Sequence, residues 1–179
     1  MKSRIFHRTI GPLLVLPLLV ILATGATYRI ARSWFGIPKE TGWKILDIHT
    51  GEWMGEIGSL IWVGVSGLGL LAMLCTGAHL LLQRGGRQPL RRWHRIVGLV
   101  LLLPLFATTL TGLAYRFGEA FFKTSESFED ILMMVHQGSW LGKPFSPFYI
   151  LLLALGLLTL AATGLQMRFR RAHHHPAQR

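Results

Sequence analysis

The sequence predicts an all-α integral membrane protein, a four-transmembrane-helix bundle made of two tandem repeats of a two-helix unit, with both termini in the cytoplasm. Three observations support this prediction. The 179 residues are 51% hydrophobic and only 15% charged, which is too apolar for an ordinary soluble domain. The apolar residues form long runs, and the loops between them alternate in charge. The two halves of the chain also match each other without a gap.

Four apolar runs are long enough to cross a bilayer core of about 30 Å, which takes about 20 helical residues. We expect transmembrane helices at about 5–28, 57–82, 96–117 and 148–167. The first run follows basic residues and ends near small ones, so alone it resembles a secretory signal peptide. Because the third run repeats it, we interpret the first as a permanent helix.

Charged residues predict the orientation. All eight acidic residues lie in the segments 29–56 and 116–147, whereas the N-terminus, the loop at 83–95 and the tail carry only basic charge. The positive-inside rule therefore places both termini in the cytoplasm, and we expect a multi-pass protein of a prokaryotic inner membrane. The net charge of +11 is sorted by loop and not gathered on one soluble face, so the expected partner is the lipid bilayer and not nucleic acid.

The internal repeat has a constant offset of 94 minus 7, or 87 residues, set by His7 and His94. We predict one membrane domain, 1–179, with repeat units at 6–86 and 93–173. The offset also pairs His49 with His136. Each unit contributes an outgoing and a returning helix, so a pseudo-twofold axis along the membrane normal should relate the units.

The paired histidines predict two haem sites. His7 and His94 begin the outgoing helices at the inner surface, and His49 and His136 precede the returning helices at the outer surface. Two imidazoles that approach from opposite sides are the axial ligands of a low-spin haem, and bundles build such sites from facing helices. The chain has one cysteine and no Cys-x-x-Cys-His motif, so both haems should be haem b. The competing interpretation is that these histidines only bridge helices by hydrogen bonds.

Other residues extend the predicted sites. Gly25 lies eighteen residues after His7, on the same helix face, and Gly112 follows His94 in the same way, so each would let backbone approach a flat porphyrin. We add Gly77 and Gly164, the glycines of the other Thr-Gly pairs. Cations for the propionates of the outer haem are Arg29 and Arg116, and those for the inner haem are Arg8, Arg84, Arg91, Arg92, Arg95 or Arg168.

His79 belongs to no pair, because its repeat partner is Gln166. It is a possible alternative ligand for the inner iron, a contact for a quinone, or a packing residue. We interpret the tail histidines, 173–175, as part of a disordered end and not as a metal site.

The motifs occur in the same order twice: His-Arg, Thr-Gly, Tyr-Arg, His-x-Gly-x-x-x-Gly and a second Thr-Gly. They stand at His7-Arg8, Thr24-Gly25, Tyr28-Arg29, His49-Thr50-Gly51 with Gly55, and Thr76-Gly77, then at His94-Arg95, Thr111-Gly112, Tyr115-Arg116, His136-Gln137-Gly138 with Gly142, and Thr163-Gly164. This order resembles the PepSY-associated transmembrane family of iron-regulated membrane proteins. The resemblance implies a dihaem core of the kind that reduces ferric siderophores at the periplasmic face. The outward loops, about 30 residues each, have no room for the PepSY domain of larger members.

The leading functional hypothesis is transmembrane electron transfer through the two haems, from a cytoplasmic or quinol donor to an extracytoplasmic acceptor such as ferric iron, a ferric siderophore, copper or a partner membrane protein. The chain has no nucleotide-binding loop or flavin domain, so whether it is itself an oxidoreductase or an electron-transfer subunit stays open. The alternative is a haem-free accessory subunit of a larger membrane complex. A metal transporter is a third hypothesis, although transporters place their sites nearer the midplane.

Overall fold

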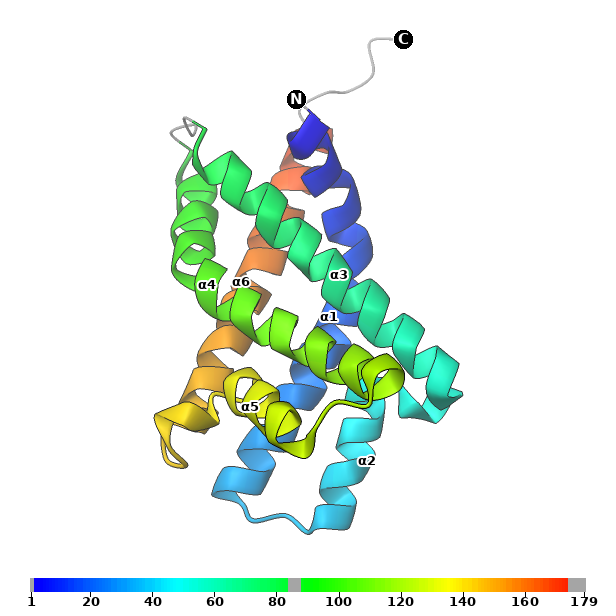
Figure 1. The fold of residues 1–179 in the computed structure, drawn as a ribbon. Coiled ribbons are helices and arrows are strands. Elements are labelled where there is room, and N and C mark those ends of the chain that lie inside the picture. Colours follow the sequence, from blue (N-terminus) through cyan, green and yellow to red (C-terminus); the bar gives the residue numbers. More distant parts are fainter. Residues whose placement is uncertain (1, 84–87, 174–179) are drawn as a thin grey trace.

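The computed structural model describes residues 2–83 and 88–173, and within them the chain is helical without strands. Its long helices are α1 (Lys2–Trp34), α3 (Gly55–Leu81), α4 (Pro89–Phe117) and α6 (Ser146–His173) (Figure 1). Shorter α2 (Lys39–Thr50) and α5 (Glu126–His136) precede α3 and α6. Single turns at η1 (Glu52–Met54), η2 (Gly118–Phe122) and η3 (Ser139–Leu141) complete the described helices.

The predicted fold class is confirmed. In the part of the chain that the structure describes, four helical segments are long and apolar enough to cross a membrane: Lys2–Trp34, Glu52–Leu81, Pro89–Phe122 and Ser146–Arg170. Most extend beyond the apolar runs, because polar flanks outside the hydrocarbon can continue the same hydrogen-bonded helix. The cytoplasmic orientation of the termini and the repeat units 6–86 and 93–173 stay predictions, and residues 84–86 lie outside the described part of the chain.

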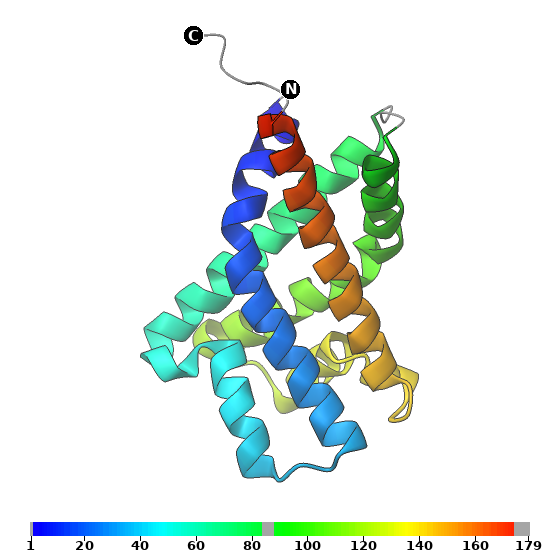
Figure 2. The ribbon, with the colours of Figure 1, turned by 180° about the vertical axis from the view of Figure 1, so that it is seen from behind.

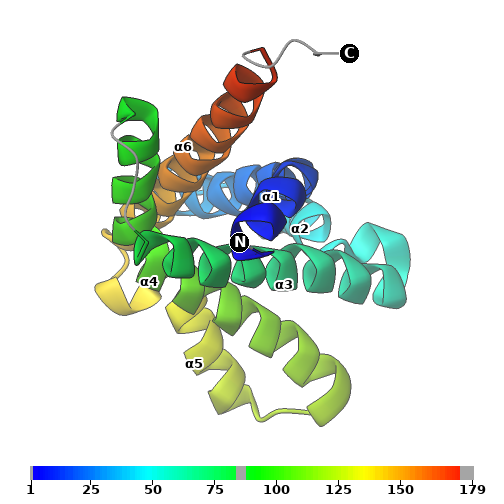
Figure 3. The same cartoon turned by 90° about the horizontal axis from the view of Figure 1, so that it is seen from above.

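The long helices form a ring around an axis. α1 packs against α3 and α6, and α4 packs against the same two helices, whereas the backbones of α1 and α4 do not come close to each other along their described residues. Figures 2 and 3 show this arrangement from behind and from above. α1, which carries His7, and α4, which carries His94, therefore face each other across the bundle.

Apolar side chains cover the outside of the ring. Leu13, Leu16 and Leu103 are each more than 70% exposed, as expected where lipid replaces water. The buried core is small, and its cluster joins three helices through Leu74, Leu101, Leu105 and Leu153.

Proline lies inside two of the spanning helices. Pro104 lies within α4, which changes direction part way along its length (Figure 1). A proline removes one backbone hydrogen bond and its ring crowds the preceding turn, so it is the identifiable cause of such a bend. α1 also continues through Pro12 and Pro17.

The short helices return along the end of the helix before them. α2 packs against α1, and α5 packs against α4. This packing turns each short helix back toward the bundle. Their last residues are therefore brought against the spanning helices.

Candidate functional site

The outer histidines lie at the ends of the two short helices. α2 ends at Thr50, directly after His49, and the next residue, Gly51, has a φ of 76°. α5 ends at His136, and Gly138 has a φ of 66°. Side chains other than glycine rarely adopt this left-handed conformation. The glycine in the third position of the motif thus ends the helix just past the histidine.

The second glycine of each motif has the same role at the next turn. Gly55 has a φ of 79° and Gly142 a φ of 88°, and each follows a single 3₁₀ turn that leads to the next spanning helix. The His-x-Gly-x-x-x-Gly pattern therefore encodes two left-handed turns that reverse the chain around each outer histidine.

The structure brings together both predicted histidine pairs. The ring centres of His7 and His94 lie 6.5 Å apart with their planes at 90°, and those of His49 and His136 lie 6.4 Å apart at 67°. His49 packs against Gly25, eighteen residues beyond His7 on α1. At 1.5 Å of rise per residue the two levels are therefore about 27 Å apart along the helix.

Backbone carbonyls fix the tautomer of the outer pair. Nδ1 of His49 lies 2.9 Å from the carbonyl oxygen of Ile21, and Nδ1 of His136 lies 2.8 Å from that of Thr108. A carbonyl oxygen only accepts, so each Nδ1 must carry the proton and donate it. Each Nε2 then keeps a lone pair that can bind a metal.

Threonine hydroxyls have the same role for the inner pair. Nδ1 of His7 lies 2.9 Å from Oγ1 of Thr76, and Nδ1 of His94 lies 2.7 Å from Oγ1 of Thr163. Each hydroxyl donates its one proton to the carbonyl four residues earlier in its own helix, at 2.8 Å and 2.7 Å. The threonine oxygen therefore accepts from Nδ1–H, which again leaves Nε2 unprotonated.

Sequence reasoning missed these threonines as site residues. The signal was present, because both belong to the Thr-Gly pairs that recur in each half. Only the glycine of each pair was interpreted as part of a site. In the structure, the threonine orients the histidine and the neighbouring glycine makes room for it.

The glycines contact the histidine rings themselves. A Cβ on Gly25 would lie 2.8 Å from Cε1 of His49, and one on Gly112 would lie 2.6 Å from Cε1 of His136. Gly77 and Gly164 are less crowded, with hypothetical Cβ atoms 3.5 Å and 3.8 Å from the inner rings. The contact with a porphyrin that the sequence predicts stays a prediction. The structure adds a nearer reason for glycine at the outer level.

Burial keeps the outer histidines neutral. Desolvation, followed by the proximity of His136, lowers the pKa of His49 from 6.5 to about 4. Burial also lowers the pKa of His136, against the hydrogen bond to Thr108 that raises it. Both side chains are therefore in the neutral form that binds metal at physiological pH.

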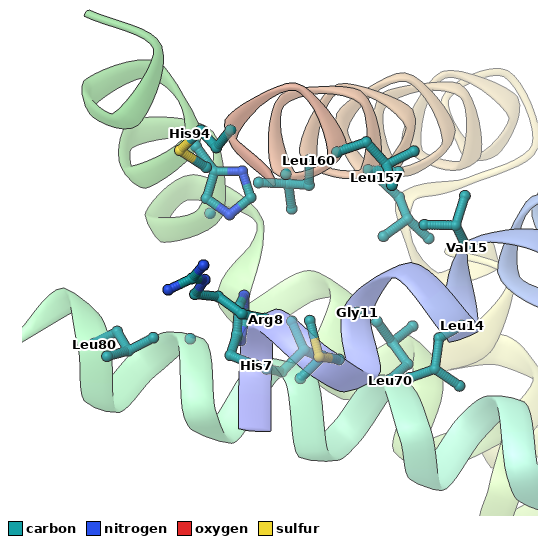
Figure 4. Close-up of a pocket in the computed structure, with 18 of the residues that line it drawn as sticks. His7, Arg8, Gly11, Leu14, Val15, Leu70, Leu80, His94, Leu157 and Leu160 are labelled. Carbon is teal, nitrogen blue, oxygen red and sulfur yellow. The ribbon is translucent and has the colours of Figure 1, made fainter. Parts of the chain in front are cut away.

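A cavity of about 300 Å³ lies at the inner pair, with His94 pointing into it from α4 and His7 across from it on α1 (Figure 4). Leucines such as Leu70 and Leu160 line its deeper part. Five arginines line it as well: Arg4, Arg8, Arg91, Arg95 and Arg168. Of the cations predicted for the inner haem, Arg92 is not among the lining residues and Arg84 lies outside the described part of the chain.

Arg29 and Arg116 each bond to a buried serine. Nε of Arg29 donates to Oγ of Ser146 at 2.9 Å, and Nε of Arg116 donates to Oγ of Ser59 at 3.0 Å. Both serines are fully buried. The role of the arginines toward propionates stays a prediction. Sequence reasoning missed the serines, because nothing in their local pattern marks them.

His79 stands apart from both pairs. It is exposed, and its Nε2 accepts from the side-chain amide of Gln83 at 3.3 Å. The cavity is lined by its neighbours Ala78 and Leu80 but not by His79 itself. The side chains of the tail histidines at 173–175 lie outside the described residues.

The ring-centre separations of the two histidine pairs are close to that expected for two imidazoles bound to one haem iron. An imidazole nitrogen lies about 2 Å from a bound metal and about 1.1 Å from its ring centre, so two imidazoles whose Nε2 atoms point at one metal from opposite sides would have ring centres about 6.2 Å apart. The observed separations are 6.5 Å and 6.4 Å. Through the described ranges, no three His, Cys, Asp or Glu side chains gather at one point. A pair of histidines suits a haem, because the porphyrin supplies the four remaining iron ligands.

A family model described as a PepSY-associated TM region matches residues 39–129, just over half of the chain. The match runs from α2 into α5 and includes His49, His94, Gly77, Gly112 and Arg116. No curated protein and no solved structure matches the chain.

Proposed function

The chain belongs to the family of PepSY-associated TM regions, and we propose that it conducts electrons across a membrane through two b haems, each bound by a pair of histidines. One observation carries this proposal. All four histidines have their Nδ1 atoms hydrogen-bonded to an acceptor, and they form two pairs whose ring centres lie 6.5 Å and 6.4 Å apart, close to the separation expected for two imidazoles on one iron. A haem bound there would supply one-electron redox chemistry.

The residues of the chain set the properties of each site. Thr76 and Thr163 accept from the inner histidines, and backbone carbonyls accept from the outer ones. Such acceptors fix the ring orientation and raise the basicity of the ligating nitrogen. The arginines around the inner cavity can form charge-assisted hydrogen bonds with carboxylates, which is the chemistry that propionates need. The apolar side chains that line the deeper part of the cavity would disfavour water there.

The predicted orientation and the membrane potential both favour outward electron flow. The predicted topology places the arginine-lined cavity at the cytoplasmic face, where a cytoplasmic donor or a quinol would deliver electrons. A membrane potential that is negative inside contributes about 2.3 kcal/mol per electron and 100 mV to movement toward the outside. The acceptor in our proposal is extracytoplasmic ferric iron, free or as a siderophore complex.

Haem binding is the first test. The protein purified in mild detergent should show about two b haems per chain by reduced-minus-oxidised spectra and pyridine haemochrome. Single alanine variants of His7, His94, His49 and His136 should each lose one haem. His79→Ala is the matched control and should keep both, because His79 lies outside the cavity lining.

Double variants identify the pairs. His7→Ala with His94→Ala should retain one haem, because both changes remove the same site, whereas His7→Ala with His49→Ala should retain none. A haem-free protein with unaltered variants would contradict the proposal and favour the accessory subunit. For transport, proteoliposomes with a trapped reductant should reduce an impermeant external ferric chelate. Vesicles with the His49→Ala protein should not do so.

A further inference from the structure

We propose that each outer histidine is positioned by the arginine of the opposite half of the chain: Arg29 holds the segment that carries His136, and Arg116 holds the segment that carries His49. The proposal rests on the proposed function only in treating the outer histidines as ligands. It concerns positioning residues, because neither guanidinium contacts a histidine ring through any hydrogen bond of the described structure.

Two parallel chains of hydrogen bonds carry the proposal. Arg29 on α1 donates to Ser146 at 2.9 Å, and Ser146 donates to the carbonyl of Gln137, next to His136, at 2.7 Å. Arg116 on α4 donates to Ser59 at 3.0 Å, and Ser59 donates to the carbonyl of Thr50, next to His49, at 2.8 Å. In both chains the serine oxygen accepts from arginine while its proton goes to the backbone.

Each spanning helix therefore contacts both outer histidine segments. α1 packs Gly25 against the ring of His49 and, one turn later, extends Arg29 to the segment of His136. α4 packs Gly112 against the ring of His136 and, one turn later, extends Arg116 to the segment of His49. Because α1 and α4 do not pack on each other, these crossed contacts fix their separation at the outer level.

The chemistry of the contacts favours positioning. Ser59 and Ser146 are fully buried, so a lost partner would not be replaced by bulk water. The guanidinium offers several donors in a fixed plane, and it holds a backbone segment more rigidly than a flexible ammonium would. The carbonyls of Thr50 and Gln137 stand at the left-handed turns, where the helix can no longer satisfy them.

The two arginines have unequal secondary partners. Arg29 also donates to Oε1 of Gln137 at 3.2 Å and to Oγ of Ser139 at 3.3 Å, so all its further bonds are to the segment of His136. Arg116 instead forms an ion pair with Glu119, three residues later in its own half of the chain, at 3.2 Å. Removal of Arg29 should therefore loosen His136 more than removal of Arg116 loosens His49.

The test is the reactivity of each histidine in the full-length, haem-free chain. Diethylpyrocarbonate modifies accessible imidazole nitrogens, and mass spectrometry of peptides reports the rate at each histidine. Arg29→Gln should raise the rate at His136 by about tenfold and leave His49 within a small factor of the wild type, and Arg116→Gln should do the reverse. Arg32→Gln is the control, because Arg32 near the end of α1 donates to the carbonyl of Ile37 in the following loop, and its loss should change neither rate.

The modification rates at the four histidines show whether the proposal is right. A rise at the histidine of the same half, or no rise, would overturn it. If an arginine variant exposes all four histidines together, its fold has been lost, and Ser146→Ala and Ser59→Ala then decide: each should show the same crossed pattern in milder form, and an equal or absent response would overturn the proposal. A wild-type chain that never binds haem would defeat the proposed function but leave this test intact.

Discussion

Gly112→Ala should remove the outer haem while leaving the inner haem in place. The added methyl group would lie 2.6 Å from Cε1 of His136, whereas ordinary contact begins at 3.4 Å. The ring and the helix must therefore separate by about 0.8 Å. His136 cannot rotate away freely, because its Nδ1 is held by the carbonyl of Thr108 at 2.8 Å. The movement must disturb either this hydrogen bond or the ligating position of Nε2.

A movement of this size should affect haem binding more than it affects the stability of the fold. Metal–ligand distances tolerate about 0.2 Å, so a shift of about 0.8 Å is incompatible with the same iron site. Overpacking costs about 1–3 kcal/mol, and replacing a helical glycine by alanine returns up to about 1 kcal/mol. The free energy of unfolding of the haem-free chain should thus fall by about 2 kcal/mol or less. Loss of haem should therefore greatly exceed loss of stability.

Haem content per chain by pyridine haemochrome is the assay, together with thermal unfolding of the haem-free form. We expect about two haems in the wild type and about one in Gly112→Ala. Leu103→Ala is the control on the same helix, because Leu103 is 77% exposed on the outer, lipid-facing surface and belongs to neither site. Two haems with an unchanged low-spin spectrum in Gly112→Ala would refute this reasoning.

Three further predictions test other contacts. Thr76→Val or Thr163→Val should weaken inner haem binding by about 10–100-fold in titrations of the haem-free protein, because the Nδ1–H loses its acceptor. Thr159→Val, at an exposed position, is the control and should bind haem as the wild type does. Equal haem affinities in Thr76→Val, Thr163→Val and the wild type would contradict this role. The unfolding temperature of the haem-free chain should be constant at pH values above 6.5 and should fall as the pH drops toward 4. The reason is that burial lowers the pKa of His49 to about 4, so the unfolded chain binds more protons than the folded chain in this range. Circular dichroism gives the pH profile, and the same profile in His49→Gln would argue against this cause. Gly51→Ala should destabilise the chain by about 1 kcal/mol or more in chemical unfolding, since its φ of 76° suits glycine, whereas Gly98→Ala, with 3.7 Å of room, should be neutral or stabilising.

The sequence determined the membrane helices and the pairing of the histidines. Long apolar runs must lie in lipid, so the four spans follow from composition and length alone. The constant offset between His7 and His94, and between His49 and His136, indicated which side chains should meet, and the structure brings both pairs within 6.5 Å. These features are regular along the chain, so a pattern in one dimension suffices to reveal them.

Only the tertiary structure decided which groups surround each histidine. Thr76 lies far from His7 in the sequence, and Ser146 lies still farther from Arg29, so no local period connects them. Their meeting depends on how the helices pack and on where the left-handed turns aim α3 and α6. The contacts of Gly25 and Gly112 with the histidine rings became visible for the same reason, because the neighbour of a glycine is known only once the helices are packed. Hydrogen bonds between distant helices act over about 3 Å, and only packed helices bring their partners that close.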